Sequence, residues 1–178
     1  MLGAIIAGGA SRRFGSDKAI ALLNGKALLD HVCDALRSQA DEVIVVGREW
    51  PGLVSVADRP LPHLGPLGGI CAALHHGLAG GYECVLTAGC DMLPLPDFSK
   101  WCGANVPTVV ESQPLLGCWP SALAADLERH LQATTNLSVY HWLDHVDANQ
   151  ISLSGIHHNF NTPADLAAYA DSLAIHPR

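Results

Sequence analysis

An apolar run that ends abruptly at two glycines is the feature of this sequence that most constrains its fold. Residues 2–7 are apolar or glycine, and Gly8 and Gly9 follow at once. A short, continuously apolar run is typical of a strand buried on both faces, as in a parallel sheet covered by helices. Similar runs at 42–46, 53–56 and 84–88 alternate with segments of helical spacing at 27–39 and 68–78. This alternation predicts an α/β fold with a mainly parallel sheet.

The remaining part of the chain gives weaker signals of the same kind. Residues 106–111 and 115–119 favour strands, and residues 121–131 and 137–146 favour helices. A last helix is expected after Thr162, which suits the N-cap, with Pro163 at the first helical position and Asp165 in the first turn. The length of 178 residues fits one domain, 1–178.

Composition and charge exclude several classes of protein. Hydrophobic residues make up 49% of the chain, which excludes general disorder. The formal net charge of −7 argues against a nucleic-acid binder, which needs a basic face. No run approaches the ~18 apolar residues of a membrane helix, and the first ten residues do not resemble a signal peptide. We therefore expect a cytoplasmic protein that binds neither nucleic acid nor membrane.

Cysteines and histidines are numerous, but their spacing does not predict a metal site. The six cysteines form no CxxC pair and are expected to be reduced core thiols: Cys33, Cys71, Cys84, Cys90, Cys102 and Cys118. The histidine pairs 75–76 and 157–158 are adjacent, whereas ligands that converge from one helix face stand four residues apart. A structural zinc site is not expected.

The loop after the first apolar run has the composition of a phosphate-binding loop. Glycines at 8, 9 and 15 let the backbone approach an anion and turn its N–H groups inward. Arg12, Arg13 and Lys18 lie within seven positions, although the whole chain has only ten basic residues. Many amide donors with a few fixed cations suit a triphosphate. The loop matches neither GxxxxGK[ST] nor GxGxxG, so it is not a P-loop or a dinucleotide fingerprint.

Two carboxylates follow predicted strands at the edge of the sheet where α/β proteins bind ligands. Asp91 comes directly after the strand at 84–88, and Asp58 after the run at 53–56. Magnesium prefers one or two carboxylates together with phosphate oxygens, which makes Asp91 the candidate metal ligand. Asp58 could equally be a turn residue before Pro60. Cys90 adjoins Asp91, and we expect it to pack in the core.

Residues 6–19 (IAGGASRRFGSDKA) resemble the opening pattern of the molybdenum cofactor guanylyltransferase (MobA) family and its nucleotidyltransferase relatives. The resemblance continues at 23–26 (LNGK), 65–69 (GPLGG), 90–91 (CD) and 159–163 (NFNTP). It implies a three-layer Rossmann-like sandwich of the nucleotide-diphospho-sugar transferase type. The nucleotide-binding half would span about 1–100 and the acceptor-side half about 101–178.

The resemblance also implies roles for single residues. Ile6, Ala7, Gly8 and Gly9 would contact the nucleotide, Lys18 would neutralise a phosphate, and Arg13 would face the leaving pyrophosphate. Asp58 would lie near the ribose or base, and Asp91 would hold Mg²⁺. Asn159 and Asn161 would bind the acceptor.

The implied reaction transfers GMP from GTP to molybdopterin and releases pyrophosphate, and molybdoenzyme assembly proteins are possible partners. Two alternatives remain open at this point. One is a related nucleotidyltransferase that uses CTP or a sugar-phosphate acceptor, and the other is a non-catalytic nucleotide-binding partner in molybdoenzyme assembly. Only Arg129 and Arg178 are basic after Lys100, so the acceptor half offers few cations. His157 and His158 could supply charge there or could be residues of an edge strand.

Overall fold

The computed structural model describes residues 1–9, 14–103, 105–153 and 157–175. Within these ranges one sheet of seven strands runs through the molecule. Its strands, in spatial order, are β10 (Asn149–Ile151), β8 (Thr108–Val110), β9 (Gln113–Pro120), β6 (Cys84–Gly89), β1 (Leu2–Ile6), β4 (Glu42–Val46) and β5 (Val54–Val56). Of these, β9 is antiparallel to both its neighbours, and the other pairings are parallel. The prediction of a mainly parallel sheet is confirmed.

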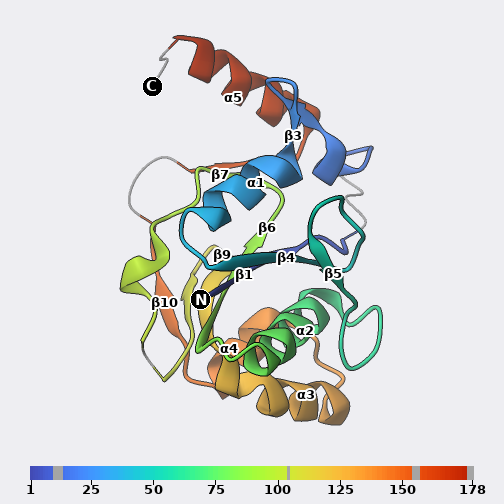
Figure 1. The fold of residues 1–178 in the computed structure, drawn as a ribbon, viewed down its shortest axis with the longest axis vertical. Helices are drawn as coiled ribbons and strands as arrows, with labels where there is room; N and C mark the ends of the chain where they lie inside the picture. The colour runs from blue at the N-terminus through green and yellow to red at the C-terminus, as the bar shows by residue number, and fades with distance from the viewer. Residues whose placement is uncertain (10–13, 104, 154–156, 176–178) are drawn as a thin grey trace.

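Helices cover both faces of this sheet and make the fold a three-layer sandwich (Figure 1). One face carries α1 (Leu28–Arg37), and α5 (Pro163–Ile175) lies farther out on the same side. The opposite face carries α2 (Gly65–Ala79), α3 (Ala124–Ala133) and α4 (Val139–His145). None of the described helices has the combination of length and apolar character that crossing a membrane requires.

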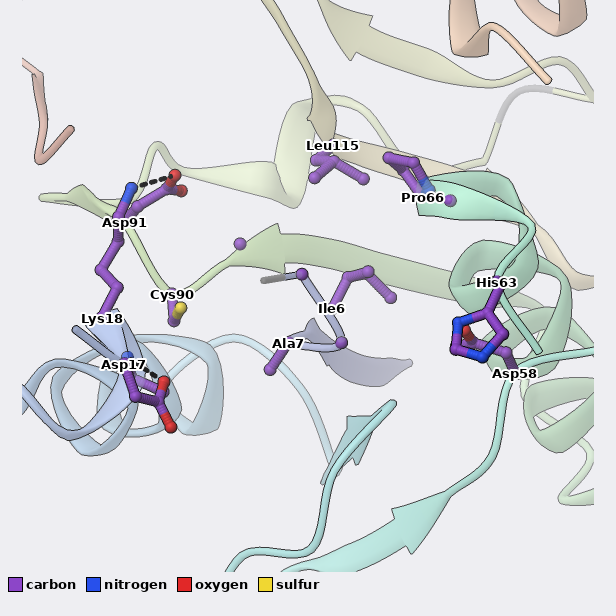
Figure 2. Close-up of a pocket in the computed structure, with 15 residues that line it drawn as sticks. Ile6, Ala7, Asp17, Lys18, Asp58, His63, Pro66, Cys90, Asp91 and Leu115 are labelled. Carbon is purple, nitrogen blue, oxygen red and sulfur yellow. Dashed lines mark hydrogen bonds and ion pairs between the residues drawn. The ribbon is translucent and has the colours of Figure 1, made fainter. Parts of the chain in front are cut away.

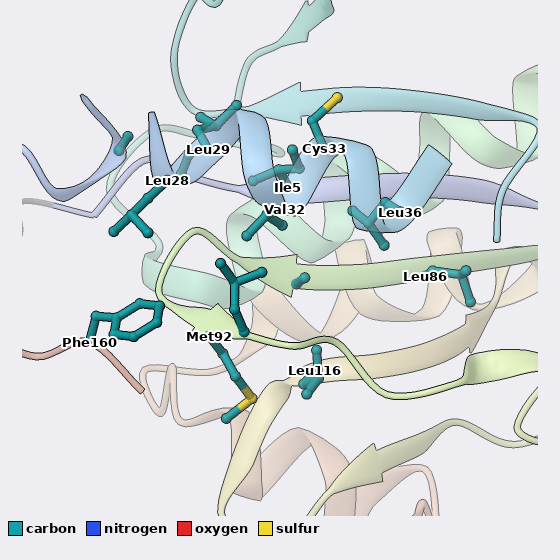
Figure 3. Packing of buried hydrophobic residues seen from close by; sticks show 14 of the residues in the cluster. Ile5, Leu28, Leu29, Val32, Cys33, Leu36, Leu86, Met92, Leu116 and Phe160 are labelled. Atoms are coloured by element: carbon teal, nitrogen blue, oxygen red, sulfur yellow. The ribbon is translucent and has the colours of Figure 1, made fainter. Parts of the chain in front are cut away.

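Each face of the sheet has its own buried core, because alternate strand residues point to opposite sides. On one side Leu28, Val32 and Leu36 of α1 pack against Ile5 and Leu86 (Figure 3). The other side buries Trp119 and Trp142, both with no exposed surface, beneath α2, α3 and α4. Because α2 lies between the sheet and α3, it is apolar on most sides rather than amphipathic.

Several short elements complete the fold, and most of them were not predicted. A hairpin of β2 (Leu22–Leu23) and β3 (Lys26–Ala27) turns at Asn24 and Gly25, whose φ angles are 51° and 79°. Positive φ at both central residues is the type I′ hairpin geometry that Asn-Gly favours. A second small ladder pairs β7 (Met92–Leu93) with β11 (His158–Asn159). The 3₁₀ turns are η1 (Lys18–Ile20), η2 (Phe98–Lys100) and η3 (Ser121–Leu123).

The boundaries of two predicted helices differ from the sequence-based expectation. The helix expected over 68–78 begins at Gly65, since Pro66 occupies the first turn, where its missing N–H costs nothing. The helix expected over 121–131 begins as η3 and becomes α-helical at Ala124. The start of α5 is as predicted, because Thr162 Oγ1 accepts a hydrogen bond from Asp165 N at 3.2 Å.

Candidate functional site

The carboxyl ends of β1, β4 and β5 meet in a backbone floor. Ala7 N donates to Val46 O at 3.0 Å, and Gly47 N donates to Val56 O at 2.9 Å. Gly8 lies just after β1 and Gly47 just after β4. The backbones of these two glycines are in close contact. A Cβ on Gly47 would lie 2.6 Å from Gly8 Cα, and Gly47 has a φ of +84°. Both facts require glycine at position 47.

A cavity of about 610 Å³, here called the sheet-edge cavity, opens above this floor (Figure 2). All seven residues that the sequence predicted to bind the nucleotide line it: Ile6, Ala7, Gly8, Gly9, Lys18, Asp58 and Asp91. The other lining residues are Asp17, Ala19, His63, Gly65, Pro66, Gly89, Cys90 and Leu115. Residues from the first 91 positions and from β9 therefore form one enclosure.

At one end of the sheet-edge cavity Lys18 and Asp91 form an ion pair across 73 positions of sequence (Figure 2). Lys18 Nζ lies 3.1 Å from Asp91 Oδ2 and 5.9 Å from the centre of the Phe14 ring. The Lys18 side chain is only 10% exposed, whereas that of Asp91 is 34% exposed. The pair thus places a fixed ammonium and a partly accessible carboxylate side by side.

Asp17 and Arg48 fix the segment that carries Lys18. Asp17 Oδ1 accepts from Ala19 N at 3.1 Å and so caps η1. The Arg48 guanidinium donates to both carboxylate oxygens of Asp17, at 3.0 and 2.7 Å. This bidentate pairing lowers the pKa of Asp17, although burial opposes the shift. Arg48 therefore influences the cavity indirectly, because it holds Asp17 and thereby the segment that carries Lys18.

The opposite end of the sheet-edge cavity holds Asp58 and His63 (Figure 2). The Asp58 carboxylate lies near the backbone of Gly8, Gly47 and Gly69, and no hydrogen bond to it is found among the described residues. Burial raises the pKa of Asp58, and His63 partly opposes that shift. A desolvated carboxylate with unused acceptor capacity suits a ligand that brings N–H or O–H donors.

Gly89 and Cys90 shape the region beside Asp91. A Cβ on Gly89 would lie 2.7 Å from Asp91 Oδ1, so the missing side chain leaves space next to this carboxylate. Burial raises the pKa of the Cys90 thiol to about 11. Cys90 also packs against the core around α1. These properties agree with the packing role expected for Cys90 rather than with a nucleophile, which must be a thiolate.

Two predicted site residues among those that the structure describes, Asn159 and Asn161, do not line the sheet-edge cavity. Arg13 is outside the described residues. Asn161 is exposed, and its backbone N–H donates to Asp165 Oδ2 at 2.9 Å in the cap of α5. Asn159 lines a separate cavity of about 400 Å³, together with Met92, Glu111, Ser112, Gln113, Ser152, Leu153 and His157.

Backbone bonding nevertheless joins the segment of Asn159 and Asn161 to the sheet-edge cavity. Phe160 N donates to Asp91 O at 2.8 Å, and β11 pairs with β7 directly after Asp91. Of the two histidines that precede, His158 belongs to β11, and its ring packs against that of Tyr169 in a tilted arrangement with ring centres 4.6 Å apart. His157 bonds to Pro94 O at 2.8 Å. Backbone hydrogen bonds therefore connect the sequence motif at 159–163 to the motif at 90–91 and to β7, which follows it.

Sequence reasoning missed Asp17, Arg48, His63 and Leu115. Asp17 belongs to the motif quoted at 6–19, but nothing in the sequence indicated that it caps η1 or pairs with Arg48. Arg48 follows Gly47 at the end of β4, so the rule that ligands bind beyond the carboxyl ends of strands could have singled it out. Leu115 belongs to β9, and only the sheet order brings it to the cavity.

Comparisons with known proteins show what this chain is similar to. Residues 3–148 match the family model of the MobA-like NTP transferase domain. A molybdenum cofactor guanylyltransferase of Rhizobium leguminosarum is 32% identical over 186 residues, which cover 93% of this chain and 89% of that protein. A homologue from Neisseria meningitidis is 39% identical over 102 residues, but this alignment spans only 52% of this chain and 53% of that protein.

Solved structures show the same fold at lower sequence identity. Molybdopterin-guanine dinucleotide biosynthesis protein A from Archaeoglobus fulgidus superposes with a TM-score of 0.74 and 21% identity, over 98% of this chain and 100% of the other. A nucleotidyl transferase from a Methanothermobacter species gives a TM-score of 0.70 and 16% identity, over 98% of both chains. The architecture is that of the nucleotide-diphospho-sugar transferases, and the chain belongs to the MobA-like NTP transferase family, whose chemistry is nucleotidyl transfer.

Proposed function

We propose that this nucleotidyltransferase is a Mg²⁺-dependent molybdenum cofactor guanylyltransferase, which transfers GMP from GTP to molybdopterin and releases pyrophosphate. The sheet-edge cavity is the observation that carries the proposal, because one enclosure contains the glycine floor, the Lys18–Asp91 pair and the Asp58 carboxylate. The likeness to named guanylyltransferases over most of the chain supports the choice of substrates.

The two ends of the cavity suit the two ends of a nucleoside triphosphate. Lys18 would offset phosphate charge, and the first turn of α2, at Gly65 and Pro66, offers the positive end of a helix. Asp58 would accept hydrogen bonds from ribose hydroxyls or from the guanine N–H groups. The nucleotide would then lie across the backbone of residues 6–9.

The residues present fit a magnesium ion at Asp91. Its carboxylate is partly exposed, and the absent side chain of Gly89 leaves room beside Oδ1. One carboxylate completed by phosphate oxygens and water is a usual donor set for Mg²⁺. When bound, the ion would polarise the α-phosphoryl group and offset its charge.

In the transfer step, an oxygen of the molybdopterin phosphate attacks the α-phosphorus of GTP. A new P–O bond forms, the bond to the α–β bridging oxygen breaks, and pyrophosphate leaves with the bonding electrons. The attacking phosphate is already ionised, so no protein base is needed. Lys18 offsets the charge that moves toward the leaving group, and Arg48 with Asp17 maintains the position of Lys18.

Pyrophosphate release by the full chain, with molybdopterin as acceptor and Mg²⁺ present, tests the proposal. GTP, CTP, ATP and UTP are compared under identical conditions, and thermal stabilisation by each nucleotide is measured in parallel. We expect turnover and the largest stabilisation with GTP. Preferred turnover of CTP would replace the proposal with a cytidylyltransferase. Nucleotide binding without pyrophosphate release from any of the four would indicate a non-catalytic binding protein.

A further inference from the structure

Three thiols gather at the end of the central sheet opposite the sheet-edge cavity. Cys84 is the first residue of β6, Cys118 lies in β9 beside it, and Cys102 follows η2. Their sulfur atoms all lie within 4.8 Å of one another, and no other His, Cys, Asp or Glu side chains in the described ranges form such a group of three. At about 3.3 Å per residue, the five steps from Cys84 to Gly89 separate this cluster from the sheet-edge cavity by roughly 16 Å.

One contact inside the cluster is closer than ordinary packing. Cys102 Sγ lies 2.6 Å from Cys118 Sγ, whereas uncharged heavy atoms usually pack at about 3.5–4 Å. Cys102 Sγ also faces Phe98 O at 3.6 Å. Cys84 and Cys118 are 7% and 2% exposed, and all six cysteines are free. Three sulfur atoms within reach of one another can share one bonding partner.

The donor set consists of sulfur alone. No carboxylate or histidine belongs to this group of three. A metal ion bound by these cysteines displaces the thiol protons. Thiolates without oxygen or nitrogen ligands select soft metal ions such as Zn²⁺ and Cu⁺.

We propose that Cys84, Cys102 and Cys118 bind one thiophilic d¹⁰ metal ion, Zn²⁺ or Cu⁺, as three thiolates. An ion with metal–sulfur bonds of about 2.3 Å at the centre of three sulfurs places them about 4 Å apart, so the Cys102–Cys118 contact has to open when the ion binds. A disulfide between Cys102 and Cys118 would use two of the sulfurs and leave Cys84 unused.

A cavity adjoins one of the three cysteines. Cys84 lines a cavity of about 520 Å³ together with Gly103, Asn105 and Ser121 among others. This cavity admits an ion, and it has room for a water as a fourth ligand, which Zn²⁺ would take. The bound ion would tie the segment after η2 to β6 and β9. The metal would therefore stabilise the fold and is independent of the nucleotidyl-transfer chemistry.

Metal titration of the full chain tests this proposal. Protein freed of metal with a chelator and kept reduced by a non-thiol reductant is titrated with Zn²⁺, and separately with Cu⁺, against a competing chromophoric chelator. We expect one ion per chain and an increase in melting temperature of about 5–10 °C at a hundredfold excess over Kd. Competition between the two titrations identifies the preferred ion.

Serine variants assign the ligands. Cys84→Ser, Cys102→Ser and Cys118→Ser are each expected to weaken binding at least tenfold, whereas Cys33→Ser and Cys71→Ser, which change equally buried thiols outside the cluster, retain it. The partly exposed Cys102 also allows Cys102→Ala, should a buried variant fail to fold. Equal losses in the Cys33 and Cys71 controls, or no stoichiometric binding by the reduced protein, would overturn the proposal. A Cys102–Cys118 disulfide in protein that binds no metal after reduction would overturn it too.

Discussion

Charge is arranged differently in the sheet-edge cavity and in the 157–165 segment that carries Asn159 and Asn161. The cavity has two specific ion pairs, Lys18–Asp91 and Arg48–Asp17. The 157–165 segment has no lysine or arginine, and residues after Lys100 contain seven acids but only Arg129 and Arg178 as bases. Yet Phe160 N donates to Asp91 O at 2.8 Å, and Asp91 in turn pairs with Lys18.

This comparison indicates how an anionic acceptor could be held by an acidic half of the chain. The backbone of the 157–165 segment is bonded to Asp91, which pairs with Lys18, so an acceptor phosphate bound there would share the cations of the first half. The segment would contribute shape and hydrogen bonds, whereas the sheet-edge cavity would contribute charge. Variants of the two regions should therefore have separable effects.

The largest effect is expected for Asp91→Asn. This change keeps the size of the side chain but removes the charge that would hold Mg²⁺, so pyrophosphate release should fall on the order of 100-fold or more while GTP affinity changes less. Turnover is measured at saturating GTP and compared with Asp144→Asn, an exposed carboxylate on α4. Near-normal turnover of Asp91→Asn would remove Asp91 from the metal site.

Lys18→Ala should weaken GTP binding rather than abolish turnover. Loss of one charge-assisted contact costs about 1.5–3 kcal/mol, which corresponds to roughly a 10- to 100-fold higher Kd. The affinity is measured by calorimetry on the folded variant, with Lys100→Ala, an exposed lysine of η2, as the matched control. An unchanged Kd would show that Lys18 does not contact the phosphates.

Asn159→Ala tests the role of the 157–165 segment. Asn159 Oδ1 is buried and has no hydrogen-bond partner among the described residues, so it is available to a ligand. We expect the KM for molybdopterin to rise about tenfold, as for one lost hydrogen bond, while the Kd for GTP stays constant. Asn149→Ala, in edge strand β10, serves as the control. A change in GTP affinity equal to that in KM would contradict the separation of the two regions.

Arg48→Ala should release Asp17 and the neighbouring Lys18 from their fixed positions and so raise the KM for GTP about fivefold.

The Arg48–Asp17 pair also makes the stability of the fold depend on pH. Because the pKa of Asp17 is lowered in the folded state, its stabilisation is present above the ordinary value of 3.8 and is lost as the pH falls through the lowered pKa. Denaturant unfolding should therefore show the variant less stable at pH 7 and closer to wild type in acid. Arg48→Lys, which cannot pair bidentately, should restore only part of the KM.

The smallest effect is expected for Asp58→Asn, and it should increase stability. Burial raises the pKa of Asp58, so its charged form destabilises the fold at pH values above that pKa. The melting temperature of the variant should exceed that of wild type at pH 7.5, and the difference should narrow as the pH falls toward the range in which Asp58 is protonated. GTP affinity should decrease in the same variant. A lower melting temperature at pH 7.5 would mean that the carboxylate is stabilised by its surroundings.

The parts of the fold and site that could be predicted from the sequence are those encoded locally. The buried strands were predicted because each is a continuous apolar run, and Gly8, Gly9 and Lys18 because glycines and cations stand together in one loop, whereas Ile6 and Ala7 came from the family resemblance. Asp91 and Asp58 followed from their positions after strands. The family resemblance added their proposed roles and the acceptor residues.

What could not be predicted depends on contacts between distant segments. Lys18 and Asp91 were each chosen for a ligand, and nothing in their spacing indicated that they pair with one another. The pairing of Arg48 with Asp17 depends on where β4 ends relative to η1. Likewise, Cys84, Cys102 and Cys118 have no motif spacing, and only the register of β6 with β9 and the position of the segment after η2 bring them together.

The close approach of Gly8 and Gly47 divides the site into a part that tolerates substitution and a part that does not. The floor consists of main chain, and any Cβ at position 47 would collide with Gly8. The shape of the floor is therefore insensitive to the identity of the surrounding side chains. The walls, by contrast, are built from the side chains of Asp58, His63 and Leu115. In a saturation library, the base and acceptor preferences should be adjustable through the walls, whereas position 47 should accept a single residue type.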